Sequence, residues 1–142
     1  MPNYVRNVLI LTGKKIDVTE ALNSIKCEKR MFAMENILPI PANSPQDIYN
    51  WKITHWGATD AVDCIKSREN IIRFSTSWTP PLQVIEALAQ KISAVKIKYY
   101  WASDDIGGDA GMQIWEEGKL IKELRPYTLA YYFCWGGLNQ IA

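Results

Sequence analysis

Residues suited to acid–base chemistry gather in one short stretch of the chain. His55, the only histidine, is flanked by Trp51 and Trp56, and Asp60 follows. A histidine next to a carboxylate can transfer a proton near neutral pH. No serine or cysteine lies in an elbow-like motif that would supply a nucleophile. The stretch therefore favours a structural loop or a binding surface, with Trp78 as a possible neighbour, over a catalytic centre.

A second stretch contains the residue types that bind hard metal ions. Asp104, Asp105 and Asp109 lie in a glycine-rich loop with Gly107 and Gly108. Mg²⁺ and Ca²⁺ prefer such oxygen ligands. The spacing does not match a calcium-binding EF-hand loop, and aspartate and glycine are also common in solvated turns. We therefore expect no metal and no cofactor here.

Lysines alternate with aromatic residues in a third stretch, 96–101. On an open sheet, Lys96, Lys98 and Tyr100 would share a face with Arg73 of a neighbouring strand, and Trp101 ends the run. Lysines that contact phosphates and aromatic rings that stack on bases are typical of single-strand binding. The alternative is a solvated strand. The net charge of +1 argues against a strongly basic surface overall.

An aromatic segment near the C-terminal end is expected to be shielded from water. Side chains of this kind are costly in water, so the segment is predicted either to pack on its own domain or to contact a partner, including a second copy of the chain. Its members are Tyr127, Leu129, Tyr131, Tyr132, Phe133 and Trp135. This apolar stretch is about half the length that a membrane span requires.

The three cysteines, Cys27, Cys64 and Cys134, are too far apart for a zinc ribbon or a redox pair. Reduced, inert thiols are the simplest interpretation. The first residues lack the apolar core of a signal peptide. We therefore expect a cytoplasmic protein without a membrane partner.

Apolar periodicity predicts the elements that would position these residues. Alternation at 71–78 and 95–101 predicts two strands, and an apolar stripe after Pro81 predicts a helix between them. Asp17, with Glu20 three residues later, predicts the capped start of an earlier helix. The remaining expectations are strands at 4–11 and 31–40, a helix from Ser44 to about Lys52, a loop at 53–70 with a helical turn near 60–65, a hairpin at 110–124 and a short final helix.

This order predicts an α+β fold with the split βαββαβ topology of a ferredoxin-like sandwich. Each main helix has one apolar stripe, so the helices should cover one face of an antiparallel sheet. A C-terminal hairpin and the aromatic tail would extend it. We expect one domain at 1–142, with a core at 1–124 and an aromatic extension at 125–142.

Several short motifs share an order and spacing with one family. They are Met1-Pro2-Asn3-Tyr4, Asn36-Ile37-Leu38-Pro39-Ile40-Pro41, Tyr49-Asn50-Trp51-Lys52, His55-Trp56-Gly57, Phe74-Ser75-Thr76-Ser77-Trp78-Thr79-Pro80-Pro81 and Ala110-Gly111. With these motifs the chain resembles the YubB-type ferredoxin-like domains of plasmids and phages, over about residues 1–124. The stretch Trp56-Gly57-Ala58-Thr59-Asp60-Ala61 departs from the family pattern because it lacks a second tryptophan. The resemblance implies the fold, a mobile-element origin and therefore the cytoplasm of a bacterial host, but no reaction.

Three functions are therefore expected, in descending order. The first is a non-enzymatic protein-binding module of a mobile genetic element, for instance an inhibitor of a host defence protein. The second is a single-stranded nucleic-acid-binding module that uses the open sheet face. The third is an enzyme centred on His55 and the acidic loop.

Overall fold

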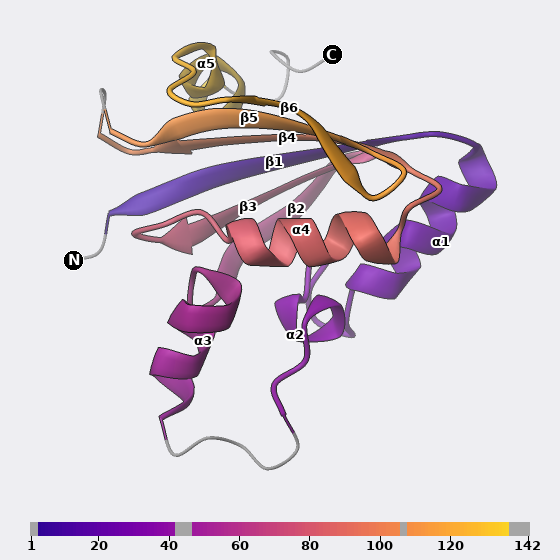
Figure 1. Ribbon diagram of the computed structural model, residues 1–142, viewed down its shortest axis with the longest axis horizontal. Coiled ribbons are helices and arrows are strands. Elements are labelled where there is room, and N and C mark those ends of the chain that lie inside the picture. The colour runs from indigo at the N-terminus through magenta and orange to yellow at the C-terminus, as the bar shows by residue number, and fades with distance from the viewer. Residues whose placement is uncertain (1–2, 42–46, 106–107, 137–142) are drawn as a thin grey trace.

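A six-stranded sheet forms the centre of the computed structural model, which describes residues 3–41, 47–105 and 108–136 (Figure 1). Its strand order is β2-β3-β1-β4-β5-β6, and every neighbouring pair is antiparallel. The strands are β1 (Tyr4–Thr12), β2 (Ala61–Arg68), β3 (Ile71–Ser77), β4 (Lys96–Ser103), β5 (Ala110–Glu116) and β6 (Lys119–Leu124).

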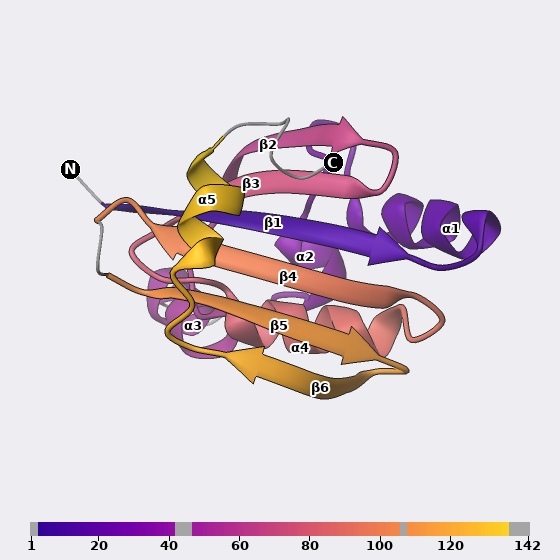
Figure 2. The same cartoon turned by 90° about the horizontal axis from the view of Figure 1, so that it is seen from above.

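Helices lie on both sides of this sheet, but unequally. Four are on one side and the fifth crosses the other side, as Figures 1 and 2 show. They are α1 (Lys15–Ile25), α2 (Met34–Ile37), α3 (Ile48–Trp56), α4 (Leu82–Lys91) and α5 (Leu129–Trp135). The order β1-α1-β2-β3-α4-β4 is the split βαββαβ arrangement, and the β5–β6 hairpin continues the sheet beyond β4. The expected ferredoxin-like fold is confirmed.

The main core lies between the sheet and helices α1 to α4. Alternate residues of each strand point into it, because successive side chains of a strand face opposite ways. Leu9 of β1, Phe74 of β3 and Leu88 of α4 are at most 2% exposed there. Burying one such side chain contributes roughly 1.5–3 kcal/mol, so this layer supplies most of the apolar stabilisation.

A smaller core lies under α5. Val8 and Ala102 of the sheet pack there against Ala130 and Cys134 of the helix. The expectation that the aromatic tail packs on its own domain is thereby confirmed for its inner side. Its outer side remains in solvent, since Leu129, Tyr132 and Trp135 are 57%, 55% and 37% exposed.

The second strand of the fold is not where the sequence predicts it. Residues 31–40 contain the short helix α2, and strand β2 occupies 61–68, inside the expected loop. Two register shifts interrupt β2, and Asp63 has a positive φ of 52°. Because bulges break the two-residue period of a strand, alternation could not reveal it. The apolar Phe32 of the supposed strand stacks on Phe74 in the core instead.

Two expected helix starts also differ. Helix α1 begins at Lys15 after Lys14, and Asp17 lies in its first turn rather than at its cap. Helix α3 begins after Asp47, whose side chain accepts a hydrogen bond from the Asn50 amide at 3.0 Å. The expected cap Ser44-Pro45 lies outside the described residues.

Within the described part of the chain, no helix is both long and apolar enough to cross a membrane.

Candidate functional site

Helix α3 has apolar side chains both in the core and in solvent. On its inner side, Trp56 is 1% exposed and its indole nitrogen donates to the Leu38 carbonyl at 2.7 Å. Ile48, Tyr49 and Ile53, nearer the start of the helix, are 42%, 60% and 40% exposed. An ordinary surface helix has one apolar stripe. Ile48, Tyr49 and Ile53 extend the apolar stripe of α3 beyond the part that is buried, so they form an apolar patch that the fold does not require.

The histidine of this helix does not form the acid–base pair that the catalytic alternative would require. The ring of His55 stacks on Trp51 at 4.5 Å between centroids, and its Nδ1 lies 2.9 Å from the Trp51 carbonyl. Asp60 instead pairs with Lys52 at 3.2 Å. His55 and Asp60 thus have different partners: His55 contacts Trp51 within α3, whereas Asp60, the residue before β2, is paired with Lys52 of α3.

Trp78 follows β3 in an unusual backbone conformation. Its φ is +69°, its side chain is 59% exposed, and its amide donates to the Asn3 carbonyl at 2.7 Å. A left-handed conformation costs a bulky residue about 1–2 kcal/mol. Strain of this kind is retained where the surrounding structure enforces it, and it concentrates at functional sites.

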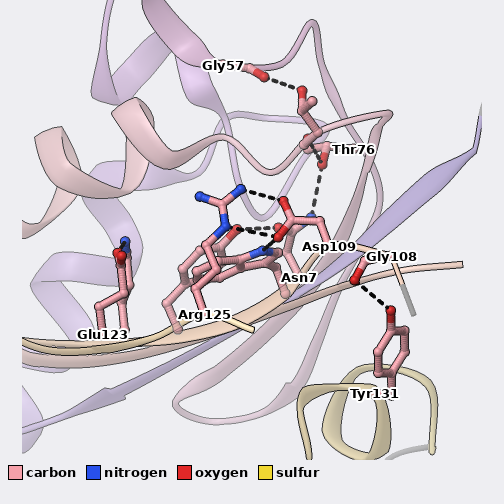
Figure 3. A network of polar contacts seen from close by, with 12 residues as sticks. Asn7, Gly57, Thr76, Gly108, Asp109, Glu123, Arg125 and Tyr131 are labelled. Carbon is pink, nitrogen blue, oxygen red and sulfur yellow. Dashed lines mark hydrogen bonds and ion pairs between the residues drawn. The ribbon is translucent and has the colours of Figure 1, made fainter. Parts of the chain in front are cut away.

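A chain of polar contacts enforces this conformation (Figure 3). The Asn7 amide donates to the Thr76 hydroxyl at 3.2 Å, and that hydroxyl donates to the Thr79 carbonyl at 2.7 Å. The Thr79 hydroxyl then donates to the carbonyl of Gly57, the residue that ends α3. Trp78 lies between Thr76 and Thr79, so the network fixes it from both sides in the chain.

The buried end of the network is rigid as well. The phenol of Tyr99 donates to the Asn7 side-chain oxygen. Burial raises the pKa of Tyr99 well above its ordinary value, so this phenol remains a donor at physiological pH. The position of Trp78 is therefore linked to the centre of the core.

Together, Ile48, Tyr49, Ile53 and Trp78 form what we call the α3–Trp78 surface. The Thr79–Gly57 contact joins the β3–α4 connection, which carries Trp78, to the C-terminal end of α3. That end is roughly 6 Å along the helix from Ile53 and roughly 14 Å from Ile48. The sequence singled out Trp78 but missed the three α3 residues, whose signal is the large number of apolar side chains in one short helix. Trp56, predicted as a binding residue, is a core residue instead.

The acidic loop has structural partners. Asp104 accepts from the Tyr4 amide at 3.3 Å, and Asp105 accepts from the Asn3 side chain at 2.8 Å. Within the residues that the structure describes, no group of three or more His, Cys, Asp or Glu side chains is arranged to hold a metal ion.

Asp109 is the third carboxylate of this loop. It pairs with Arg125 at 2.7 Å and accepts from the Trp101 indole at 3.0 Å (Figure 3). Trp101 is fully buried, so it is a core residue rather than the predicted binding residue. Asp109 therefore ties the end of the β5–β6 hairpin to the core.

The predicted basic strand face exists, but part of it is covered. Lys98 and Tyr100 are half-buried, and the Tyr100 ring lies 4.7 Å from that of Phe133 in α5. Arg73, predicted to be exposed, is 7% exposed. It donates to the carbonyls of Phe133 at 2.9 Å and Cys134 at 3.2 Å. Helix α5, whose position the sequence did not reveal, covers it.

The three cysteines should differ in reactivity. Hydrogen bonding from the Lys29 backbone lowers the pKa of Cys27, whereas burial raises the pKa of Cys64 and raises that of Cys134 to about 12. Because the thiolate is the reactive form, iodoacetamide at pH 8 should modify Cys27 first and Cys134 only after unfolding. Peptide mass spectrometry over time measures this order, and early modification of Cys134 in the folded protein would contradict the described packing.

Comparison with known proteins is consistent with the fold. A family model described as "Ferredoxin-like domain in Api92-like protein" matches residues 51–128, more than half of the chain. The solved structure of a protein Api92 from Yersinia pseudotuberculosis is similar, with a TM-score of 0.49 and 15% identity over 66% of this chain. The match spans 39% of that protein's chain. A search of curated proteins finds no match. The ferredoxin-like part of the expected resemblance is confirmed, whereas its YubB-type part stays a resemblance.

Proposed function

We propose that this chain, which belongs to the family of ferredoxin-like domains in Api92-like proteins, is a protein-binding module that contacts its partner through the α3–Trp78 surface. The observation that carries the proposal is Trp78, a large aromatic residue held exposed in a left-handed backbone. A glycine would occupy that position without strain. Retaining tryptophan there is understandable if the indole itself is needed.

The chemistry of the surface fits a protein partner. Tryptophan and tyrosine are the residues that most often dominate binding energy at protein interfaces, where they fill pockets on the partner. Trp78 and Tyr49 are the two most exposed members of this surface, and Ile48 and Ile53 add aliphatic area beside Tyr49. The partner we propose therefore offers apolar pockets. Inhibition of a host defence protein by a plasmid- or phage-borne module is one version of this proposal.

Substitution of Trp78 separates the cost of strain from the benefit of binding. For Trp78→Gly we expect an unfolding free energy within about 1 kcal/mol of wild type, because relief of strain offsets the lost indole contacts. Trp78→Ala keeps the strain and loses the indole, so it should be less stable than Trp78→Gly by about 1 kcal/mol. Urea unfolding followed by circular dichroism measures both values.

Partner capture tests the function itself. Tagged wild-type protein, Trp78→Gly and the double variant Tyr49→Ala/Ile53→Ala should be compared in nuclease-treated host lysate by quantitative mass spectrometry. We expect one protein to be retained by wild type and reduced at least tenfold with either variant. The control is Ile16→Ala, which removes another exposed side chain, 65% exposed in α1. A partner retained equally by all four proteins would refute the proposed surface.

A further inference from the structure

The side of the sheet that faces α5 carries an excess of basic residues, although the net charge of the whole chain is only +1. Even-numbered residues of β1 face α5: Val8 packs beneath that helix, and Arg6 stacks on Trp135 at 4.3 Å. Residues directly opposite on antiparallel strands share a face. The register therefore places these basic residues on the α5 side: Arg6, Arg68, Arg73, Lys96, Lys98 and Lys122.

Few carboxylates balance them. Among the described strand residues that the register places, Glu116 is the carboxylate on this side, where it pairs with Lys96 at 3.1 Å. Asp63, in the bulge of β2, lines a hollow beside Arg6 and Arg73. Because the net charge is only +1, most acidic residues must lie elsewhere. The charge of the chain is therefore segregated between its two sides.

One row of this face crosses all six strands. In the order of the strands across the sheet, from β2 to β6, its residues are Arg68, Ile71, Ile10, Lys98, Ile114 and Lys122. With neighbouring strands about 4.8 Å apart, the row is roughly 24 Å long. Arg68 and Lys122 are exposed, and Ile10, Lys98 and Ile114 are half-exposed. Three cations at intervals thus lie along an aliphatic floor.

Helix α5 borders this row. It crosses the strands rather than following them, as Figure 2 shows, so it runs alongside the row. The next residue along β4 toward α5 on this face is Tyr100, which packs against Phe133 and Tyr127. All three rings are half-exposed. The row and the helix together form a ledge, whose floor is aliphatic with cations at intervals and whose side is aromatic.

We propose that this ledge binds single-stranded nucleic acid, with Lys98, Lys122 and Arg68 on phosphates and Tyr100 against a base. Cations spaced along a track complement a phosphate backbone, and aromatic rings stack on bases whatever their sequence. A duplex hides its base faces, so the aromatic side of the ledge selects unpaired strands. This activity does not depend on the α3–Trp78 surface, because α3 lies on the other side of the sheet (Figure 1).

Fluorescence anisotropy with labelled oligo(dT) and oligo(U), at about 50 and 200 mM salt, tests the ledge. Wild type should bind with a salt slope of about −2 for three phosphate contacts. Lys98→Glu/Lys122→Glu should lose at least tenfold in affinity and flatten the slope. Tyr100→Leu should lose about tenfold with an unchanged slope.

The matched control changes charge equally on the helix side. Lys15→Glu/Lys29→Glu alters two exposed lysines and should retain near wild-type affinity, with circular dichroism confirming that all variants fold. Equal losses in the two double variants would reduce the effect to net charge and overturn the proposal. So would duplex binding as tight as single-strand binding, binding to anionic vesicles alone, or no binding at 50 mM salt.

Discussion

Gly111→Ala should destabilise the protein by about 3 kcal/mol, although it adds one methyl group. Gly111 of β5 pairs with Trp101 of β4, and the indole lies directly over it. A Cβ at this position would overlap the Cζ2 and Cη2 atoms of Trp101 and lie 2.7 Å from Cε2. The indole cannot move aside, because it is fully buried, stacks on Tyr99 at 5.3 Å and is hydrogen-bonded to Asp109.

A double-mutant cycle identifies the clash as the cause. Trp101→Phe removes the part of the ring that Gly111 accommodates, so Gly111→Ala should cost much less in that background. Chemical unfolding of the four proteins yields the coupling free energy. If Gly111→Ala costs the same in both backgrounds, the close approach of Trp101 is not the reason for the glycine.

Trp56→Ala should lower the unfolding free energy by about 3–5 kcal/mol. Trp56 is the residue by which α3 enters the core, and it also donates a hydrogen bond to the Leu38 carbonyl. Its loss leaves a cavity and removes the donor of a carbonyl in the segment between α2 and α3. We therefore expect α3 to lose protection from hydrogen exchange before the sheet does.

Two other substitutions calibrate this result. Trp56→Phe retains the apolar volume in part but loses the hydrogen bond, so it should cost distinctly less than Trp56→Ala. Trp51→Ala removes a half-exposed ring and should cost less again. Equal losses for Trp51→Ala and Trp56→Ala would mean that the two tryptophans share the anchoring of α3.

The sequence predicted the fold where side chains follow a regular period. Ile72 and Phe74 alternate with Arg73 and Ser75, and that alternation matches the two faces of β3. The prediction from periodicity was wrong at β2, where bulges shift the period. It was also wrong at 31–40, where apolar residues pack in the core on the helix side of the sheet. Local pattern does not encode which irregular segment a distant residue such as Phe74 will contact.

The candidate sites show the same division. Trp78 could be selected as a site residue because of its type, but its left-handed backbone depends on contacts between Asn7, Thr76 and Thr79. The basic row could not be found from local sequence, since Arg68, Lys98 and Lys122 become neighbours on one face only through the pairing of six strands. The net charge of the whole chain, +1, does not reveal this arrangement, because acidic residues elsewhere offset the basic ones on this face.

The central position of β1 has a consequence for how the protein is made. Asn7 of β1 hydrogen-bonds with Thr76 and Tyr99, which are 69 and 92 positions later in the chain. At 5–20 residues per second, ribosomes take roughly 5–20 s to synthesise that interval. Until β3 and then β4 are synthesised, the apolar strand Tyr4–Thr12 lacks the neighbours that cover its two edges, so we expect chaperones to bind this segment of the nascent chain.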